Sequence, residues 1–286
     1  AYAALYDRSI LDLFTGGLYG PPTLDETERA FVDNAAALPT NDAPLWVKWN
    51  CTAYVAESLQ KRFGDEVETL RAALNARASI DLRVNTLVAG VNEVMQQLQG
   101  EGISLEKLNT VSSGLRLREQ RYLENHPLFR AGAFELQDKG SQLAAKLCGA
   151  RPGETVIDLC AGGGGKTLAL AADMEDQGRL IAVDIDERRL RRLEPRLKRA
   201  HVFCVTSEVL SSKPDKRAQD LERLAACADL VVVDAPCSGS GTWRRHPEAR
   251  WRYHGNDIDR FAETQGNLLR EATTLVKKGC LLYTSD

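Results

Sequence analysis

The chain has 286 residues, of which 43% are hydrophobic and 27% are charged, with a formal net charge of −3 at pH 7. These values are ordinary for a globular protein of two or three domains. They exclude a generic polyanion binder, so any nucleic-acid surface must be a local basic patch. The sequence contains no run of about 18 apolar residues, the length that a membrane-spanning helix needs.

Cysteine usage and the start of the chain predict a cytoplasmic protein. Seven cysteines are scattered along the chain, and no two have C-x-x-C spacing. This pattern argues against a disulfide framework and a structural zinc site, and the histidines show no ligand spacing either, so we expect no metal. No basic-then-apolar leader follows Ala1. Because the first residue is not Met, we expect a fragment or a processed chain.

The first half of the chain predicts two regions. Residues 1–75 have helix-like apolar spacing and read as a helical bundle for docking or stability. Residues 76–137 predict a small α+β module of ferredoxin-like type, a motif that many RNA-binding proteins use. Its expected elements are strands at 81–86, 114–117 and 134–137 and a helix at 91–100.

Residues 138–286 alternate between strands and helices, which is typical of a parallel, doubly wound α/β sheet. In such sheets, ligands bind outside the carboxyl ends of the strands. We expect strands at 155–159, 180–183, 202–205 and 230–234, a helix at about 258–276, and the start of a fifth strand at 281–283.

A glycine-rich loop follows the first of these strands and ends in Lys166-Thr167, where a helix begins. Such a loop lets the backbone approach a ligand closely. A phosphate-cradling P-loop needs a glycine where Cys160 stands, so that interpretation fails. The loop is compatible with two other cofactor classes, nicotinamide dinucleotides and S-adenosylmethionine, and the glycines alone do not distinguish them. Asp184 ends the next strand, where a carboxylate accepts the hydroxyls of a ribose, although it could also cap a helix.

The segment from Asp234 to Cys237 (Asp-Ala-Pro-Cys) distinguishes these cofactors. A thiolate that adds to carbon 6 of cytosine makes carbon 5 nucleophilic enough to attack a methyl sulfonium, and elimination of the thiolate then releases the product. This chemistry needs a cysteine near the methyl group and an acid that hydrogen-bonds the pyrimidine edge. A buried, inert thiol is the commoner fate of a lone cysteine, but the flanking Asp234 and Ser238-Gly239 favour the catalytic interpretation.

Several long motifs, in order, resemble the RsmB/Nop/Sun family of RNA cytosine-5 methyltransferases. They are residues 82–86 (Leu-Arg-Val-Asn-Thr), 134–142, 158–167, 183–184, 234–242 and 244–248. The resemblance covers roughly residues 46–283. It implies a Rossmann-like, class I S-adenosylmethionine-dependent methyltransferase domain that acts on ribosomal or transfer RNA. Of the two, we favour ribosomal RNA as the partner, and we expect a monomeric protein.

The resemblance also assigns roles to residues of this sequence. Asp234 would contact the cytosine, Lys166 would belong to the catalytic group, and Cys237 would assist product release. The family's nucleophile lies on the fifth strand, in a Tyr-x-Thr-Cys-Ser context. The cofactor would be held by Cys160, Ala161, Gly162, Gly163, Gly164, Gly165, Lys166, Asp184 and Asp234.

The sequence departs from the family pattern in three places. Gly162-Gly163 replaces the usual Ala-Pro of the loop, and Ser207-Glu208 stands where an adenine-contacting Asp is common. Residues 279–286 begin like the nucleophile strand but have no cysteine after Tyr283, and residues 280–286 read like translated sequencing adapter. We therefore expect the natural protein to continue beyond Gly279, the nucleophile to be missing here, and the sheet to be incomplete.

Two basic clusters remain. Arg244, Arg245 and Arg250 follow the catalytic loop beside Trp243 and Trp251, and we expect them to contact RNA phosphates while the aromatic rings stack on a base. The arginines and lysine between positions 188 and 199 are expected to form, for the most part, a solvated helix face. Two other functions stay open: an NAD-dependent oxidoreductase, and a catalytically incomplete protein that binds RNA or assists ribosome assembly.

Overall fold

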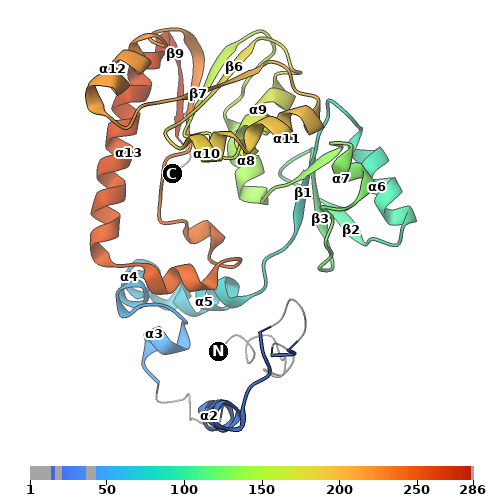
Figure 1. The fold of residues 1–286 in the computed structure, drawn as a ribbon, viewed down its shortest axis with the longest axis vertical. Coiled ribbons are helices and arrows are strands. Elements are labelled where there is room, and N and C mark those ends of the chain that lie inside the picture. Colours follow the sequence, from blue (N-terminus) through green and yellow to red (C-terminus); the bar gives the residue numbers. More distant parts are fainter. Residues whose placement is uncertain (1–13, 17–20, 37–42, 285–286) are drawn as a thin grey trace. The chain divides into compact units, whose positions relative to one another are not determined.

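The computed structural model describes residues 14–16, 21–36 and 43–284 (Figure 1). The chain divides into two compact units. The first contains residues 1–78 and 238–259, and the second contains residues 79–237 and 260–286. The segment just after Cys237 therefore packs with residues that lie early in the sequence.

Helices make up most of the described part of the first unit, as the sequence predicts for residues 1–75. The part of that prediction that covers residues 1–13, 17–20 and 37–42 lies outside the described residues. Thr52 Oγ1 accepts a hydrogen bond from the backbone N–H of Val55 and so caps α4. The elements are α2 (Glu26–Ala36), α3 (Leu45–Lys48), α4 (Ala53–Phe63), η2 (Gly64–Glu66), α5 (Val67–Asn75), η3 (Ser240–Thr242) and η4 (Pro247–Arg252).

Arg250 lies in the core of the first unit. Trp49, Val55 and Val67 pack there against Trp243, and Arg250 is only 2% exposed. Its guanidinium donates to Asn75 Oδ1 at 2.6 Å, to the carbonyl of Trp243 at 3.2 Å, and to the carbonyl of Leu74. The guanidinium thus satisfies polar groups at the end of α5 that burial would otherwise leave without donors.

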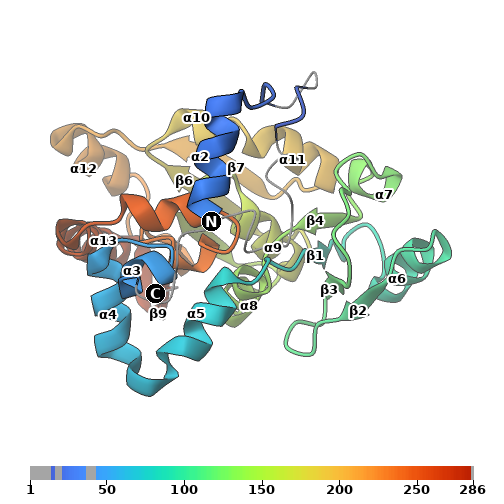
Figure 2. The ribbon, with the colours of Figure 1, turned by 90° about the horizontal axis from the view of Figure 1, so that it is seen from below.

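The second unit begins with an antiparallel sheet of order β2-β3-β1-β4, which is the ferredoxin-like arrangement that the sequence predicts. Figure 2 shows α6 and α7 beside these strands. Leu82, Leu115 and Phe134 from the strands pack against Val94 and Leu98 of α6. The elements are β1 (Asp81–Val84), α6 (Val91–Gly100), β2 (Leu105–Lys107), β3 (Gly114–Leu117), α7 (Pro127–Arg130) and β4 (Phe134–Leu136).

The rest of the second unit is a parallel sheet of order β7-β6-β5-β8-β9. Its central strands, β5, β6 and β8, are buried and largely apolar on both faces, as a sheet covered by helices on both sides requires. Helices α8, α9 and α11 cover one face and α12 and α13 the other (Figure 1). The elements are α8 (Lys139–Leu147), β5 (Thr155–Leu159), α9 (Gly165–Asp173), β6 (Arg179–Asp184), α10 (Glu187–Leu190), α11 (Leu193–Ala200), β7 (Val205–Val209), α12 (Pro214–Glu222), β8 (Ala228–Val233), α13 (Gly255–Leu275) and β9 (Val276–Thr284).

The strand order reverses between β5 and β8. The two strands are parallel neighbours, with Leu159 opposite Val233. The chain continues from β5 towards β6 and β7, and from β8 towards β9 on the other side. The loops that leave β5 and β8 therefore diverge from a shared edge, and this is where open α/β sheets bind ligands.

Three strand predictions needed correction. The third strand of the parallel sheet is Val205–Val209 and not 202–205, because Val202 ends α11 by donating to Leu197 and packs into the core. Strand β2 was missed because Glu106 and Lys107 are exposed. Strand β9 begins at Val276, so Cys280 lies within this strand and does not precede it.

Among the described residues, no helix combines the length and the apolar character that crossing a bilayer requires.

Replacing Arg250 by Met should destabilise the first unit, since the buried acceptors at Asn75 and Leu74 would lose their donor. The expected loss is about 2–4 kcal/mol, the sum of hydrogen bonds from a charged group. Arg245→Met, at an exposed position of the same segment, should change stability by less than about 0.5 kcal/mol. Urea unfolding of both variants measures the difference, and equal losses would contradict the structural role of Arg250.

Candidate cofactor and catalytic site

The glycine loop after β5 alternates between ordinary and left-handed backbone. Cys160, Gly162 and Gly164 have φ angles of 82°, 56° and 81°. A Cβ at position 164 would stand 2.1 Å from Leu193 Cδ1, so only glycine fits there. The backbone N–H groups of Cys160 and Ala161 both donate to the carbonyl of Val183, at 2.8 and 2.9 Å. The loop is thereby held against the end of β6, which carries Asp184.

Asp184 is only 4% exposed and lies against the glycine loop. Its Oδ2 accepts a hydrogen bond from the N–H of Gly162 at 2.8 Å, and its Oδ1 accepts one from the N–H of Asp186 at 2.9 Å. Arg189 Nη1 lies 3.7 Å from Oδ2. The structure thus brings the expected ribose-binding carboxylate next to the expected cofactor loop. Asp186, and not Asp184, caps α10, which removes the competing interpretation of Asp184 as a helix cap.

Asp158 is a fully buried carboxylate beneath the loop that the sequence analysis did not single out. Its Oδ2 accepts a hydrogen bond from Thr167 Oγ1 at 2.6 Å, while its Oδ1 has no partner among the described residues. Burial raises the pKa of Asp158 to about 6, against the smaller opposing effect of the Thr167 hydrogen bond. The position inside a motif, at the end of an apolar strand, was the signal that could have identified it.

Lys166 and Asp234 meet at the shared edge of β5 and β8. Lys166 Nζ lies 2.7 Å from Asp234 Oδ2, and the side chains are 14% and 41% exposed. Cys237, in the turn after β8, has an exposed thiol. In contrast, Cys160 is partly buried, and burial raises the pKa of its thiol to about 12. Cys237 is thus the accessible cysteine of the two, and an ion pair of opposite charges lies three residues before it.

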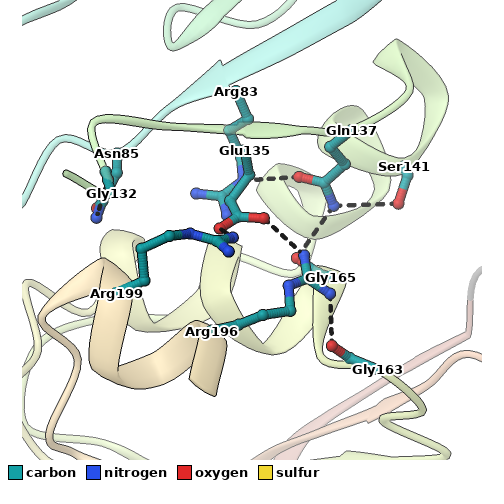
Figure 3. A network of polar contacts seen from close by, with 10 residues as sticks. All are labelled: Arg83, Asn85, Gly132, Glu135, Gln137, Ser141, Gly163, Gly165, Arg196 and Arg199. Atoms are coloured by element: carbon teal, nitrogen blue, oxygen red, sulfur yellow. Dashed lines mark hydrogen bonds and ion pairs between the residues drawn. The ribbon is translucent and has the colours of Figure 1, made fainter. Parts of the chain in front are cut away.

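A network of polar side chains joins the ferredoxin-like module to the glycine loop (Figure 3). Glu135 of β4 is bound by Arg196, at 2.8 Å, and by Arg199, both from α11. Arg196 Nη1 also donates to the carbonyl of Gly163 at 2.5 Å. The strand that carries Glu135 therefore fixes an arginine that holds the loop by its backbone.

A second connection in this network runs through Gln137, just after β4. Its Nε2 donates to the carbonyl of Gly165 at 3.1 Å and to Ser141 Oγ at 3.2 Å. Its Oε1 accepts from Arg83 Nε at 2.7 Å. Both ends of the Gly163–Gly165 segment are therefore bound to side chains that the module positions. The sequence could not reveal these contacts, because partners such as Glu135 and Arg196 are 61 positions apart.

The structure separates the arginines that were expected to form an RNA surface. Arg245 is exposed. Arg244 donates to the carbonyls of Ala76 and Arg77, at 3.3 and 2.5 Å. Arg250 and Trp243 are buried, so we assign them a structural role and correct the expectation that Arg250 contacts phosphate and that Trp243 stacks on a base.

Trp251 keeps the exposure that a stacking role needs. It is 41% exposed, donates from its ring to Asn50 at 2.9 Å, and packs edge-on against Trp46 with ring centroids 6.0 Å apart.

The basic helix after Asp184 is only partly the solvated face that the sequence predicts. Arg188 and Arg191 have side chains that are 89% and 73% exposed. Arg196 and Arg199 are exceptions, since both are drawn to the buried carboxylate of Glu135. Ser207 and Glu208 lie within β7, and no adenine contact is assigned to them. Among the described residues, no group of three or more potential ligands is arranged to hold a metal ion.

Two family models match most of the chain. One, described as 16S rRNA methyltransferase RsmB/F, matches residues 145–285. The other, described as the ferredoxin-like domain of RsmF/B-like methyltransferases, matches residues 52–124. The probable ribosomal RNA small subunit methyltransferase B of Bacillus subtilis is 31% identical over 204 residues, which are 71% of this chain and 44% of that protein. The chain spans about half the length of the curated relatives it matches.

Solved structures agree with the fold. The crystal structure of PH0851 has a TM-score of 0.80 and 32% identity, and the match covers 89% of this chain and 58% of that one. A methyltransferase homologue from Pyrococcus horikoshii has a TM-score of 0.71 and 26% identity, over 83% of this chain and 73% of that one. The expected Rossmann-like methyltransferase fold is confirmed.

The buried Asp158 predicts a pH dependence of stability. Because its folded-state pKa of about 6 lies above the ordinary 3.8, the folded chain holds this proton more tightly than the unfolded chain. The stabilisation is complete below pH 4 and is lost as the pH rises through 6. From pH 5 to pH 7.5, the free energy of unfolding of Asp158→Asn should rise relative to the parent by about 1–1.5 kcal/mol.

Urea unfolding at both pH values measures this change in the difference. Asp215→Asn, at an exposed position on α12, is the control and should show no such change. A constant difference between Asp158→Asn and the parent at the two pH values would mean that Asp158 does not titrate in this range.

Proposed function

Since this chain belongs to the RsmB/Nop/Sun family of methyltransferases, we propose that it transfers a methyl group from S-adenosylmethionine to carbon 5 of a cytosine in ribosomal RNA. The observation that carries this proposal is the Lys166–Asp234 ion pair, which lies between the glycine loop and the turn that bears Cys237. It stands at the edge where β5 and β8 diverge, so cofactor and base would meet there.

The residues around the loop fit a nucleoside cofactor. The left-handed backbone at Gly162 and Gly164 keeps side chains away from the loop surface, and Asp184 offers a nearly buried carboxylate for ribose hydroxyls. Bound S-adenosylmethionine supplies an electrophilic methyl group on a sulfonium. Residues 160–166, with Asp184 and Asp234, would hold it with this methyl group towards the substrate base.

Asp234 and Lys166 would orient the cytosine. A carboxylate accepts a hydrogen bond from the exocyclic amine of cytosine, as it does in base readout by Glu and Asp. Lys166 holds Asp234 in one position by the 2.7 Å ion pair. The pair would therefore position the ring while a cysteine thiolate adds to carbon 6, and carbon 5 becomes the nucleophile.

Cys237 would act late in this sequence. After methyl transfer, carbon 5 still carries its proton, and the thiolate leaves carbon 6 only when a base removes that proton. The Cys237 thiol is exposed in the turn after Asp234, so it can reach a cytosine ring that Asp234 holds. We assign it to this release step and not to the initial attack, as the family resemblance implies.

Ribosomal RNA is the proposed substrate class because the relative from Bacillus subtilis is a probable ribosomal RNA small subunit methyltransferase. Exposed Arg245 and exposed Trp251 offer the cation and the ring that single-stranded RNA binds. A monomer in the cytoplasm accords with this role.

Because the nucleophilic cysteine is expected beyond Gly279, the test uses the protein with its natural sequence restored after that residue. This protein and its variants are incubated with radiolabelled S-adenosylmethionine and an unmodified small-subunit ribosomal RNA transcript. We expect 5-methylcytidine as the labelled nucleoside after digestion. Lys166→Met should lower the transfer rate at least 100-fold, in the range for loss of a positioned acid–base group, while the exposed-site control Lys198→Met should not. In Cys237→Ala, a protein–RNA adduct that survives denaturation should accumulate. Label on any other nucleoside would exclude the proposed chemistry.

A further inference from the structure

Arg83, on the central strand β1 of the ferredoxin-like module, is a buried cation without a counter-ion. It is only 4% exposed. Its Nε donates to Gln137 Oε1 at 2.7 Å, and within the part of the chain that the structure describes its guanidinium forms no ion pair. Burial lowers the pKa of Arg83 to about 10, with Glu135 opposing this effect, so the group stays charged at neutral pH. Buried charges in proteins are normally paired.

The nearest carboxylate is already occupied by other arginines. Glu135 Oε2 is bound by Arg196 and Glu135 Oε1 by Arg199, and Figure 3 shows all three guanidinium groups around this single acid. The cluster therefore carries three positive charges against one negative charge. Arg83 is the arginine of this cluster that forms no ion pair with Glu135. An anion from outside the cluster would compensate the excess positive charge.

The space for such an anion lies beside Arg83. A cavity of about 520 Å³ is open to solvent on this side of β1, which suits a small ligand or one nucleotide. Gln142, only 2% exposed, also lines it, and its Nε2 donates to the carbonyl of Gln137 at 2.8 Å. The basic and uncharged polar residues of its lining are Arg83, Thr86, Ser112, Ser113, Gln142 and Lys146.

The acidic residues that line the cavity form no ion pair with Arg83, although Asp173 acts on it electrostatically. Asp173 is paired with Lys146 at 3.1 Å, and Glu175 is exposed. Three residues with hydroxyl groups, Thr86, Ser112 and Ser113, thus line a solvent-accessible space together with Arg83, which has no ion-pair partner among the described residues. A guanidinium fork matches two phosphate oxygens, as in bidentate arginine–phosphate pairs.

We propose that this cavity binds one phosphodiester group of the substrate RNA through Arg83, with Ser112 and Ser113 as additional donors. The inference rests on the proposed RNA methyltransferase function and adds a contact that the glycine loop and Cys237 do not provide. Since Gln137 joins Arg83 to the carbonyl of Gly165, the bound phosphate would also be connected to the loop that holds the cofactor.

Anisotropy titrations of an unmodified Bacillus subtilis small-subunit ribosomal RNA transcript at several salt concentrations test the site. Arg83→Met should weaken binding five- to tenfold and flatten the slope of log K against log salt by about 0.7–0.9, the loss of one phosphate contact. Arg118→Met is the control, because Arg118 is exposed on the same module and is paired with Glu106. Its slope should match that of the parent.

A second variant leaves Arg83 and Gln137 untouched. Ala172 is half-buried on α9 and lines the cavity, so Ala172→Phe should fill the space and weaken RNA binding to a similar extent, with the melting temperature of the parent. S-adenosylmethionine affinity, measured by calorimetry, should stay within twofold in Ala172→Phe. This readout separates a blocked phosphate site from a damaged cofactor site.

Other outcomes overturn the inference in distinguishable ways. If the parent binds RNA but Arg83→Met and Ala172→Phe keep its salt slope, Arg83 only supports Gln137 and the phosphate site is wrong. If inorganic phosphate at constant ionic strength raises the melting temperature of the parent but not of Arg83→Met, with RNA binding unaffected, the anion is a free phosphate and not RNA. A parent chain that binds S-adenosylmethionine but no RNA would defeat the proposed function itself.

Discussion

The buried carboxylate of Glu135 is the interaction on which the rest of the second unit depends. It is 5% exposed and shared between Arg196 and Arg199 of α11. Burying these charged groups costs desolvation free energy. Their electrostatic attraction offsets that penalty only if the ion-pair geometry is good and the remaining N–H donors are hydrogen-bonded. Arg196 meets this condition by donating to the carbonyl of Gly163. A residue of the ferredoxin-like module thereby sets the position of the loop that would hold the cofactor.

This dependence gives the module a role besides the proposed RNA contact. Strand β4 carries Glu135 and leads directly into Gln137. Glu135 binds Arg196, which donates to the carbonyl of Gly163, and Gln137 itself donates to the carbonyl of Gly165. Gly132, just before β4, has a φ of 75°, and a Cβ there would stand 1.9 Å from the carbonyl oxygen of Arg199. The backbone of the module thus lies in direct contact with α11. The hydrogen bonds between the module and the loop would therefore connect bound RNA with bound cofactor.

The sequence was informative where function depends on a local pattern. The apolar strand before Asp158, the consecutive glycines and the segment from Asp234 to Cys237 are continuous in sequence, and the fold brings them together because β5 and β8 are neighbours. The apolar runs also predicted β5, β6 and β8 closely, since strands buried on both faces have few polar residues. The exposed strand β2 lacks that signal.

Long-range side-chain partnerships could not be predicted. The sequence shows Arg250 as one of several arginines near Cys237, and only the structure reveals that its partners are at positions 74 and 75, about 175 residues earlier. Arg196 and Arg188 belong to the same basic run, yet one is bound to a buried acid and the other is exposed. Which member of a charged run is buried depends on the neighbouring element, here β4, and a single sequence does not specify that contact.

The central claim is that Arg196 holds the glycine loop in the conformation that binds S-adenosylmethionine. Calorimetric titration of the cofactor into the parent, Arg196→Met and Arg192→Met tests it most directly, because Arg192 is an exposed neighbour just before the same helix. Arg196→Met should bind about tenfold more weakly, because it loses one charge-assisted hydrogen bond, while Arg192→Met should bind like the parent. Equal affinities of all three proteins, with the melting temperature of Arg196→Met unchanged, would contradict the account.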